Sequence, residues 1–262
     1  MIDRPRVGLL YNPTTPELIA YAPALVEHLS VMPDRLWFDF GGDTKAGRFH
    51  PLHGAIAQLV CDAAGRSLAG HGLGLSLPSA MPLDRAMVAA VASMSRDLGG
   101  FAWYSEHLNL FITPNGSVAN AQAGLGLPVV YDEEAFTLIA AKLDALAAAL
   151  GCRVLLENGS FFTPVPDLDF TEPAFLSRLY REGRCGTLLD LHNLLVNARN
   201  GGMEPMKYLA ELELAAVEEV HLAGGDEAAG FYMDSHSTLT PEVVWEMAYA
   251  LAALPQPAGD HL

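Results

Sequence analysis

The chain is poor in cysteine and in basic residues. Its three cysteines, Cys61, Cys152 and Cys185, form no C-x-x-C pair and are too few for a disulfide framework, so they favour a reducing compartment. Lys and Arg number 15 against 31 Asp and Glu, which gives a net charge of −16. Because the phosphate backbone of a nucleic acid requires clustered positive charge, this balance argues against a nucleic-acid partner.

The sequence also lacks the long apolar runs of targeting and membrane segments. The start, MIDRPRVGLLYN, has no long apolar region of the kind found in signal peptides. No stretch reaches the roughly 18 uninterrupted apolar residues of a membrane span. The Ala-rich run at 140–150 is shorter and carries Lys142 and Asp144. We therefore expect a cytoplasmic protein that does not associate with membranes.

Short apolar runs typical of strands alternate with longer helical patterns. We predict strands near residues 7–12, 35–40, 69–76, 100–108, 153–158, 186–192 and 217–223. We predict helices near 15–30, 52–64, 84–97, 132–150, 172–182, 204–214 and 240–253. Several strand segments, such as VLLE and TLLD, are apolar at consecutive positions, as in strands that are buried on both faces of a parallel sheet.

This alternation favours one α/β domain over residues 1–262, a (β/α)8 TIM barrel. An eighth strand is not identified, because only LPQPAGDHL follows the last predicted helix. The fold class is therefore a barrel in which strand eight is missing or truncated. A doubly wound open sheet is the alternative, but the loop YNPTTPE after the first strand is not the glycine-rich phosphate loop of that class.

Six segments, five of them predicted strands and the last in the loop after the seventh predicted strand, end on or close to a side chain that binds transition metals. They are LAGHG, WYSEHL, VLLENG, TLLDLHN, VEEVHLAGG and MDSHS, and they contribute His71, His107, Glu157, Asp190, His192, His221, Asp234 and His236. A single histidine on a strand is usually structural. In a barrel, however, the carboxyl ends of the strands meet at one mouth, so residues in this order are expected to converge there. The sequence therefore predicts a multinuclear metal site.

The residue types narrow the choice of metal. Asp190 with His192, and Asp234 with His236, are i and i+2 pairs, which share one face of an extended backbone. Glu157 is the best candidate for a carboxylate that bridges two ions. Imidazole and carboxylate ligands without thiolate suit iron, manganese or zinc. We expect the catalytic role to fall on residues of this set, namely His107, Glu157, Asp190 and His192.

The ordered motifs resemble those of the multinuclear non-heme iron-dependent oxidative enzymes, a family that includes the oxidase of methanobactin biosynthesis. The resemblance covers about two thirds of the chain, from His71 to Trp245, and is carried by HGLGLSL, SEHL, LLENGSFF, LLDLHNLLVNARNGG, VHLAGG and DSHS followed by VW. It implies a xylose-isomerase-like TIM barrel with two or three irons. It also implies O2-dependent oxidation of a residue, often cysteine, in a ribosomally made precursor peptide that a small partner protein presents.

The resemblance also implies a distribution of ligands. His71, His107 and Glu157 would surround one iron, and Glu157, Asp190 and His221 a second. The third position would use the remaining residues, His192, Asp234 and His236. The family normally places a further carboxylate on strand eight, about 30 residues after the histidine of D-x-H, and this sequence ends before that position.

Two other functions compete with the oxidase. One is a divalent-metal sugar isomerase, epimerase or phosphodiesterase on the same barrel, with zinc or manganese as a Lewis acid. A sugar isomerase usually needs a lysine or an acid pair for proton transfer, and no lysine ends a predicted strand. The other is a degenerate, non-catalytic barrel, for which the lack of an eighth strand is the main argument.

Overall fold

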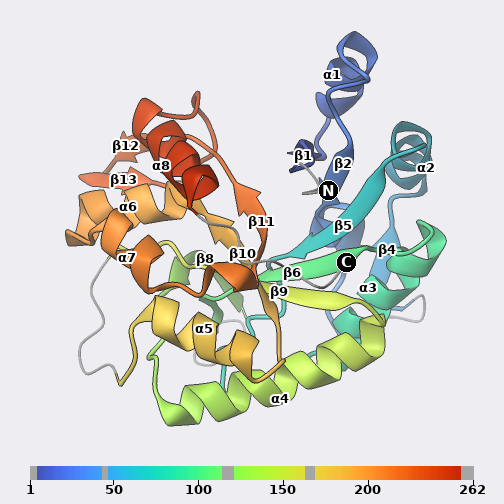
Figure 1. Ribbon diagram of the computed structural model, residues 1–262. Helices are drawn as coiled ribbons and strands as arrows, with labels where there is room; N and C mark the ends of the chain where they lie inside the picture. Colours follow the sequence, from blue (N-terminus) through green and yellow to red (C-terminus); the bar gives the residue numbers. More distant parts are fainter. Residues whose placement is uncertain (1–4, 43–46, 114–120, 163–168, 255–262) are drawn as a thin grey trace. The chain divides into compact units, whose positions relative to one another are not determined.

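The computed structural model describes residues 5–42, 47–113, 121–162 and 169–254. The chain divides into two compact units. The first comprises Met1–Leu75, Leu83–Glu106 and Ala145–Arg153, and the second Ser76–Pro82, His107–Asp144 and Val154–Leu262. Both units combine parallel strands with helices, so each is considered in turn (Figure 1).

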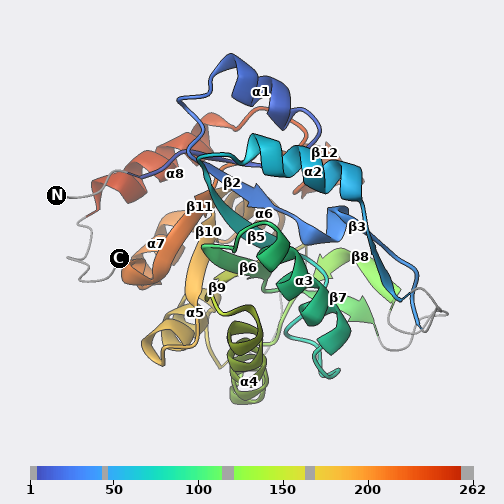
Figure 2. The ribbon, with the colours of Figure 1, turned by 90° about the vertical axis from the view of Figure 1, so that its right-hand side faces the viewer.

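The first unit contains four parallel strands in the order β1 (Gly8–Leu10), β2 (His28–Val31), β5 (Ser67–Gly72) and β6 (Trp103–His107). Figure 2 shows β2, β5 and β6 side by side. The helices are α1 (Thr15–Tyr21), α2 (His53–Asp62) and α3 (Arg85–Asp97). Asp84 caps α3 because its side chain accepts a hydrogen bond from the Met87 amide at 3.0 Å, and this cap fixes where the helix begins.

The second barrel strand is not where the sequence pattern placed it. Residues 35–40 do contain a strand, but it lies outside the parallel sheet, and the prediction of a helix through residue 30 was wrong. Helix α1 ends at Tyr21, and the proline at 23 disfavours helical backbone at the residue before it. All four residues of β2 are buried, which makes HLSV a core strand. The aromatic segment that follows forms β3 (Trp37–Asp39), which pairs antiparallel with β4 (Phe49–Pro51) as a separate ribbon.

The second unit is built on three parallel strands, β9 (Arg153–Glu157), β10 (Gly186–Asp190) and β11 (Val217–His221), with β10 in the middle. Antiparallel ribbons add β7 (Leu110–Thr113) with β8 (Ala121–Leu127), and β12 (Asp226–Ala228) with β13 (Phe231–Met233). The helices are α4 (Glu133–Leu150), which begins in this unit and ends in the first, α5 (Glu172–Arg181), α6 (Leu191–Gly201), α7 (Pro205–Glu211) and α8 (Glu242–Ala253). Gly151, at φ +68°, follows α4 and ends it.

Helix α6 was not predicted, because the apolar pattern suggested that the strand continued to residue 192. The strand ends at Asp190, whose carboxylate accepts a hydrogen bond from the Asn193 amide at 2.9 Å and caps the helix. After β11, the described residues contain the β12–β13 ribbon and α8 but no further parallel strand. The segment expected to hold an eighth strand, residues 255–262, lies outside the described residues.

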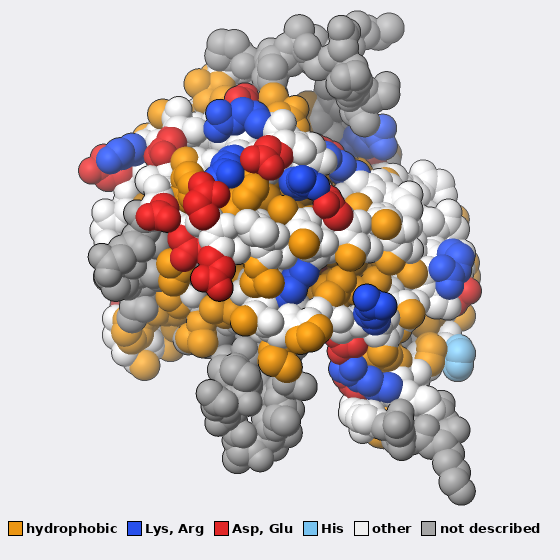
Figure 3. Space-filling view, turned by 90° about the horizontal axis from the view of Figure 1, so that it is seen from below, with side chains coloured by type: hydrophobic (Ala, Val, Ile, Leu, Met, Phe, Trp, Pro, Cys, Tyr) orange, Lys and Arg blue, Asp and Glu red, His pale blue; other side chains and the backbone are white. Residues whose placement is uncertain are grey.

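Charges of both signs are mixed on the surface. Figure 3 shows acidic and basic side chains interspersed on one face. Within the second unit, Arg178 pairs with Glu133 at 2.6 Å and with Glu182 at 3.2 Å. Within the described residues, no helix is long and apolar enough to cross a membrane.

Gly72 at the end of β5 is predicted to tolerate no side chain. A Cβ there would overlap the hydroxyl of Tyr104 and a carboxylate oxygen of Glu106, and both of these residues are fully buried. Gly72→Ala should therefore lower the free energy of unfolding by about 1–3 kcal/mol, the usual cost of overpacking. Gly54→Ala in α2 is the control, since its Cβ would meet open space, and it should be neutral or stabilising. Chemical denaturation that gives equal stabilities would contradict this account.

Candidate metal centre

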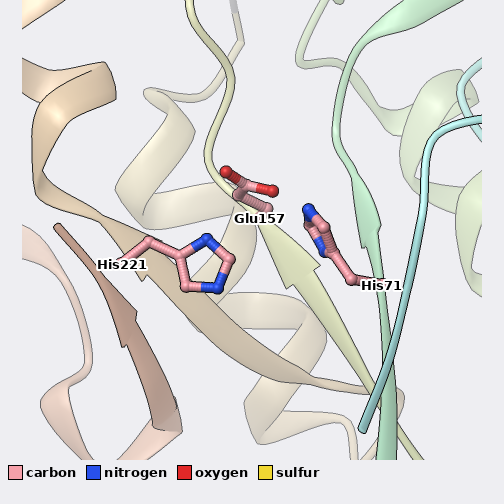
Figure 4. Close-up of side chains that lie close together, drawn as sticks. All are labelled: His71, Glu157 and His221. Carbon is pink, nitrogen blue, oxygen red and sulfur yellow. The ribbon is translucent and has the colours of Figure 1, made fainter. Parts of the chain in front are cut away.

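Seven of the eight predicted ligands belong to the second unit, where the strand register brings several of them together. Leu188 of β10 is the register partner of Glu157, and Asp190 is the partner of His221. Figure 4 shows the side chains of Glu157 and His221 close together. A carboxylate oxygen of Glu157 and a ring nitrogen of His221 lie within 4.8 Å of each other. The strand ends of this unit therefore converge as the sequence predicted.

Glu157 is held from two sides. Its Oε2 lies 3.1 Å from Nε2 of His107, the last residue of β6. Its Oε1 accepts a hydrogen bond of 3.3 Å from the Asn193 amide group, and Asn193 also donates to the main-chain carbonyl of Asn158. The Asn158 side chain in turn exchanges two hydrogen bonds with the backbone of Asp190. Asn193 and Asn158 therefore tie the Glu157 side chain to the end of β10 through buried hydrogen bonds.

The two carboxylate oxygens of Asp190 have different surroundings. Oδ1 caps α6 through Asn193. Oδ2 is buried, accepts no hydrogen bond from the described residues, and lies 3.9 Å from Nδ1 of His221. Burying a carboxylate oxygen without a hydrogen-bond donor destabilises the folded state. This atom is therefore a candidate metal-binding atom.

A second group lies beside the first and contains His192, Asp234 and His236. Oδ1 of Asp234 lies 3.1 Å from Nδ1 of His192 and 2.9 Å from Nε2 of His236. His236 adopts a left-handed backbone with φ +52°, which is uncommon for a residue other than glycine and is often found at functional sites. Both imidazole rings thus lie beside the same carboxylate oxygen of Asp234, and these three donors could together bind one cation.

His71 belongs to the first unit and lies on β5, next to the end of that strand (Figure 4). It is buried, and its Nδ1 lies 2.8 Å from the hydroxyl of Ser105. That hydroxyl donates to the carbonyl of Gly70, so its oxygen is left to accept from Nδ1–H of the imidazole. The hydrogen bonds therefore assign the proton to Nδ1 and leave Nε2 of His71 as the nitrogen able to bind a metal.

The acids of the second unit are held at high electrostatic cost. Burial raises the pKa of Glu157 well above 4.5, and the carboxylates of Asp190, Asp234 and Glu219 raise it further. Burial also raises the pKa of Asp190. For Asp234, burial acts in the same direction, but the hydrogen bonds from His192 and His236 outweigh it and hold the pKa below 3.8. Bound cations would stabilise the ionised form of all four acids.

The residues present fit a transition metal. The donors are imidazole nitrogens and carboxylate oxygens, and the cysteines lie elsewhere: Cys61 is exposed in α2, and Cys185 is buried directly before β10. Such a donor set suits iron, manganese or zinc better than soft metal ions, such as Cu(I), that prefer thiolate ligands. The donorless oxygen of Asp190 and the clustered acids supply the charge that two or three divalent cations would balance.

Glu219 and Tyr232 were not predicted from the sequence as part of this region, and Gly225 was expected only as a loop glycine. Glu219 lies two positions before His221, and its Oε1 is 3.1 Å from Nε2 of that histidine. The hydroxyl of Tyr232 lies 3.3 Å from Nε2 of His192. Gly225 passes so close to the His192 ring that a Cβ would lie 3.0 Å from Nε2. The i, i+2 spacing could have revealed Glu219, whereas no local pattern links Tyr232 to a histidine 40 residues away.

A buried acid outside the ligand set supports the loop after β9. Glu172, at the start of α5, accepts hydrogen bonds from the Gly159 amide at 2.8 Å and from the Tyr131 hydroxyl at 2.7 Å. Burial raises the pKa of Glu172 from 4.5 to about 7, although the hydrogen bonds from Gly159, Tyr131 and Tyr208 lower it. Glu172 therefore links the stability of this loop to pH.

Glu172 makes a pH-dependent contribution to folding. Because its pKa is higher in the folded state, the folded protein binds the proton more tightly, and this stabilisation is lost as the pH rises through about 7. Between about pH 5 and pH 8, wild type should lose about 2–3 kcal/mol of unfolding free energy relative to Glu172→Gln. Urea denaturation at several pH values measures this difference. The exposed Glu134→Gln variant is the control and should keep the pH dependence of wild type. The same dependence of unfolding free energy on pH in both variants would contradict the prediction.

Comparison with known proteins identifies the fold and the family. Two solved structures share the fold: 3-keto-D-glucoside 4-epimerase YcjR from E. coli (TM-score 0.51, 11% identity, 95% of this chain and 89% of that one) and a D-psicose 3-epimerase from Clostridium cellulolyticum (TM-score 0.51, 12% identity, 82% and 68%). These similarities confirm the predicted α/β class, the xylose-isomerase-like TIM-barrel fold, and at such identities they show the fold alone.

Relatives in sequence extend over most of the chain. It is 34% identical over 224 residues to a UPF0276 protein of Chromobacterium violaceum, covering 86% of this chain and 78% of the relative. A UPF0276 protein of Anaeromyxobacter is 31% identical over 227 residues, covering 86% and 77%. Residues 19–259 match the family described as RiPP precursor modification enzyme MbnB/TglH/ChrH. The chain therefore belongs to this family of enzymes, which modify ribosomally synthesised precursor peptides.

Proposed function

We propose that this protein is a cytoplasmic, multinuclear iron- and O2-dependent enzyme that oxidises a residue, often cysteine, of a ribosomally made precursor peptide. The observation that supports this most strongly is the cluster of buried imidazole and carboxylate ligands at the strand ends of the second unit. The family match supplies the substrate class, a precursor peptide. A small partner protein that presents the peptide is part of the proposal.

The proposed ligands fall into three sets. His71, His107 and Glu157 would hold one iron, and Glu157, Asp190 and His221 would hold a second. His192, Asp234 and His236 would hold a third. Iron bound there would supply the one-electron and O2 chemistry that protein side chains lack.

The chain's own contribution is to orient these ligands and to exclude water. Asn193 and Asn158 fix Glu157 and the end of β10 through buried hydrogen bonds. Ligands held by such partners lose little conformational freedom when a metal binds, so the site is preorganised. Catalysis is proposed to depend on His107, Glu157, Asp190 and His192, whose side chains range from fully buried to 15% exposed.

The test combines the iron-loaded protein with the short peptide encoded next to its gene, together with any small partner protein encoded there. We expect O2 uptake and a change in peptide mass that tandem mass spectrometry places on one residue. Iron-loaded Glu157→Gln should give neither, and the exposed Glu134→Gln variant should behave as wild type. Iron-replete wild type that consumes no O2 and leaves the peptide unchanged would contradict the proposal. Turnover of a sugar or phosphodiester with zinc or manganese would favour the isomerase or phosphodiesterase alternative.

A further inference from the structure

We propose that Glu219 is a positioning residue of the metal centre, which holds the ring of His221 so that Nδ1 faces Asp190 and binds the metal. This inference rests on the metal centre of the proposed function. Glu219 is absent from the eight ligands that the motifs indicate. Its proposed role is to orient one of those ligands, His221.

The two ring nitrogens of His221 have different surroundings. Nε2 lies 3.1 Å from Oε1 of Glu219, a hydrogen-bond distance. Nδ1 lies 3.9 Å from Oδ2 of Asp190, which is too long for a hydrogen bond. A carboxylate can only accept from a neutral imidazole, so Glu219 places the proton on Nε2. The lone pair of His221 is then on Nδ1, on the side of the donorless Asp190 oxygen.

The position of Glu219 on β11 explains how this contact arises. Residues i and i+2 of a strand share a face, so Glu219 and His221 project to the same side. The Glu219 side chain is 11% exposed, and its charge raises the pKa of Glu157. Placing a fourth carboxylate among buried acids is unfavourable without a cation. A carboxylate that orients a metal-binding histidine is a common arrangement, and its loss typically weakens metal binding 10–100-fold.

Glu218 provides a matched control. It is the neighbouring residue on the same strand, has the same side chain, and is exposed. A change at this position therefore tests for general effects of removing an acid from β11. Glu219→Gln adds a second contrast, since the glutamine carbonyl can still accept from Nε2–H but carries no charge.

The experiment titrates metal-free wild type, Glu219→Ala, Glu219→Gln and Glu218→Ala with Co2+, whose absorption spectrum reports on nitrogen and oxygen ligands. We expect Glu219→Ala to bind one equivalent about 10–100-fold more weakly. Glu219→Gln should recover most of that affinity, and Glu218→Ala should match wild type. Thermal unfolding of each variant verifies its fold. A two-bond 1H–15N correlation spectrum of metal-free wild type, recorded where the imidazole is neutral, should show His221 protonated at Nε2.

Each other outcome overturns the inference. Equal affinities for Glu219→Ala and Glu218→Ala would remove Glu219 from the centre. Glu219→Gln as weak as Glu219→Ala would make Glu219 a direct ligand instead of a positioning residue. A His221 proton on Nδ1 would exclude the proposed orientation. Failure of the peptide oxidation alone would leave the Co2+ result intact, whereas wild type that binds no Co2+ would overturn both proposals.

Discussion

Glu157→Gln is expected to lose more than half of the bound metal while making the metal-free protein more stable. Metal is lost because Glu157 is proposed to bridge two ions and is held by His107 and Asn193. Stability rises because the pKa of Glu157 is raised well above 4.5 in the folded state. Wherever the unfolded chain has lost this proton, folding must either bind a proton or bury a charge, and glutamine requires neither. The stability gain should therefore be present at neutral pH and should disappear at a pH low enough to protonate Glu157 in both the folded and the unfolded state.

Elemental analysis and urea denaturation of the metal-free protein measure the two effects. Glu172→Gln is the matched control, because Glu172 is also a buried acid with a raised pKa but is not a proposed ligand. It should gain stability at neutral pH and keep its metal. A Glu157→Gln variant that retains full metal, or one that is less stable than wild type without metal, would contradict the assignment of Glu157 to the centre.

Loading the protein with Fe2+ under anaerobic conditions is expected to raise its melting temperature by about 5–10 °C. A ligand that binds only the folded state at 100 times its Kd stabilises it by about 2.7 kcal/mol. One kcal/mol shifts the melting temperature of a chain of roughly this size by about 2–4 °C. The effect arises because the cations neutralise four clustered carboxylates, including Glu157 and Asp190.

Differential scanning fluorimetry or calorimetry with and without metal tests this expectation. A chelator should reverse the shift, and Glu157→Gln should show less than half of it. A melting temperature that is unchanged by iron, or a shift of equal size in Glu157→Gln, would show that metal does not bind where the buried acids cluster.

The sequence predicted the parts of the fold that depend on consecutive apolar residues. VLLE and TLLD are buried throughout in β9 and β10, and their terminal Glu157 and Asp190 lie at the strand ends as expected. It failed where local apolar character was misleading. The aromatic segment after residue 35 forms an antiparallel ribbon, while the shorter HLSV, with a histidine and a serine, is the buried barrel strand. Burial by neighbouring strands, which the local pattern does not encode, decides between these segments.

The candidate site shows the same division. Each proposed ligand was predicted from its own segment, because strand ends of a parallel sheet meet at one edge. What each ligand touches was not readable, since Asn193 reaches Glu157 across 36 positions and Tyr232 reaches His192 across 40. Glu219 was not predicted, although it lies two positions before His221 and therefore on the same face of β11. Support of a ligand by a second residue is a property of the packed structure and carries little local signal.

The central claim is that this chain holds two or three irons in a centre built from histidine and carboxylate ligands. The most direct test is the metal content per chain of protein expressed with added iron and purified without oxygen. We expect two or three irons per chain, with little zinc or manganese. A chain that carries no metal, or only zinc or manganese although iron was supplied in excess, would contradict it.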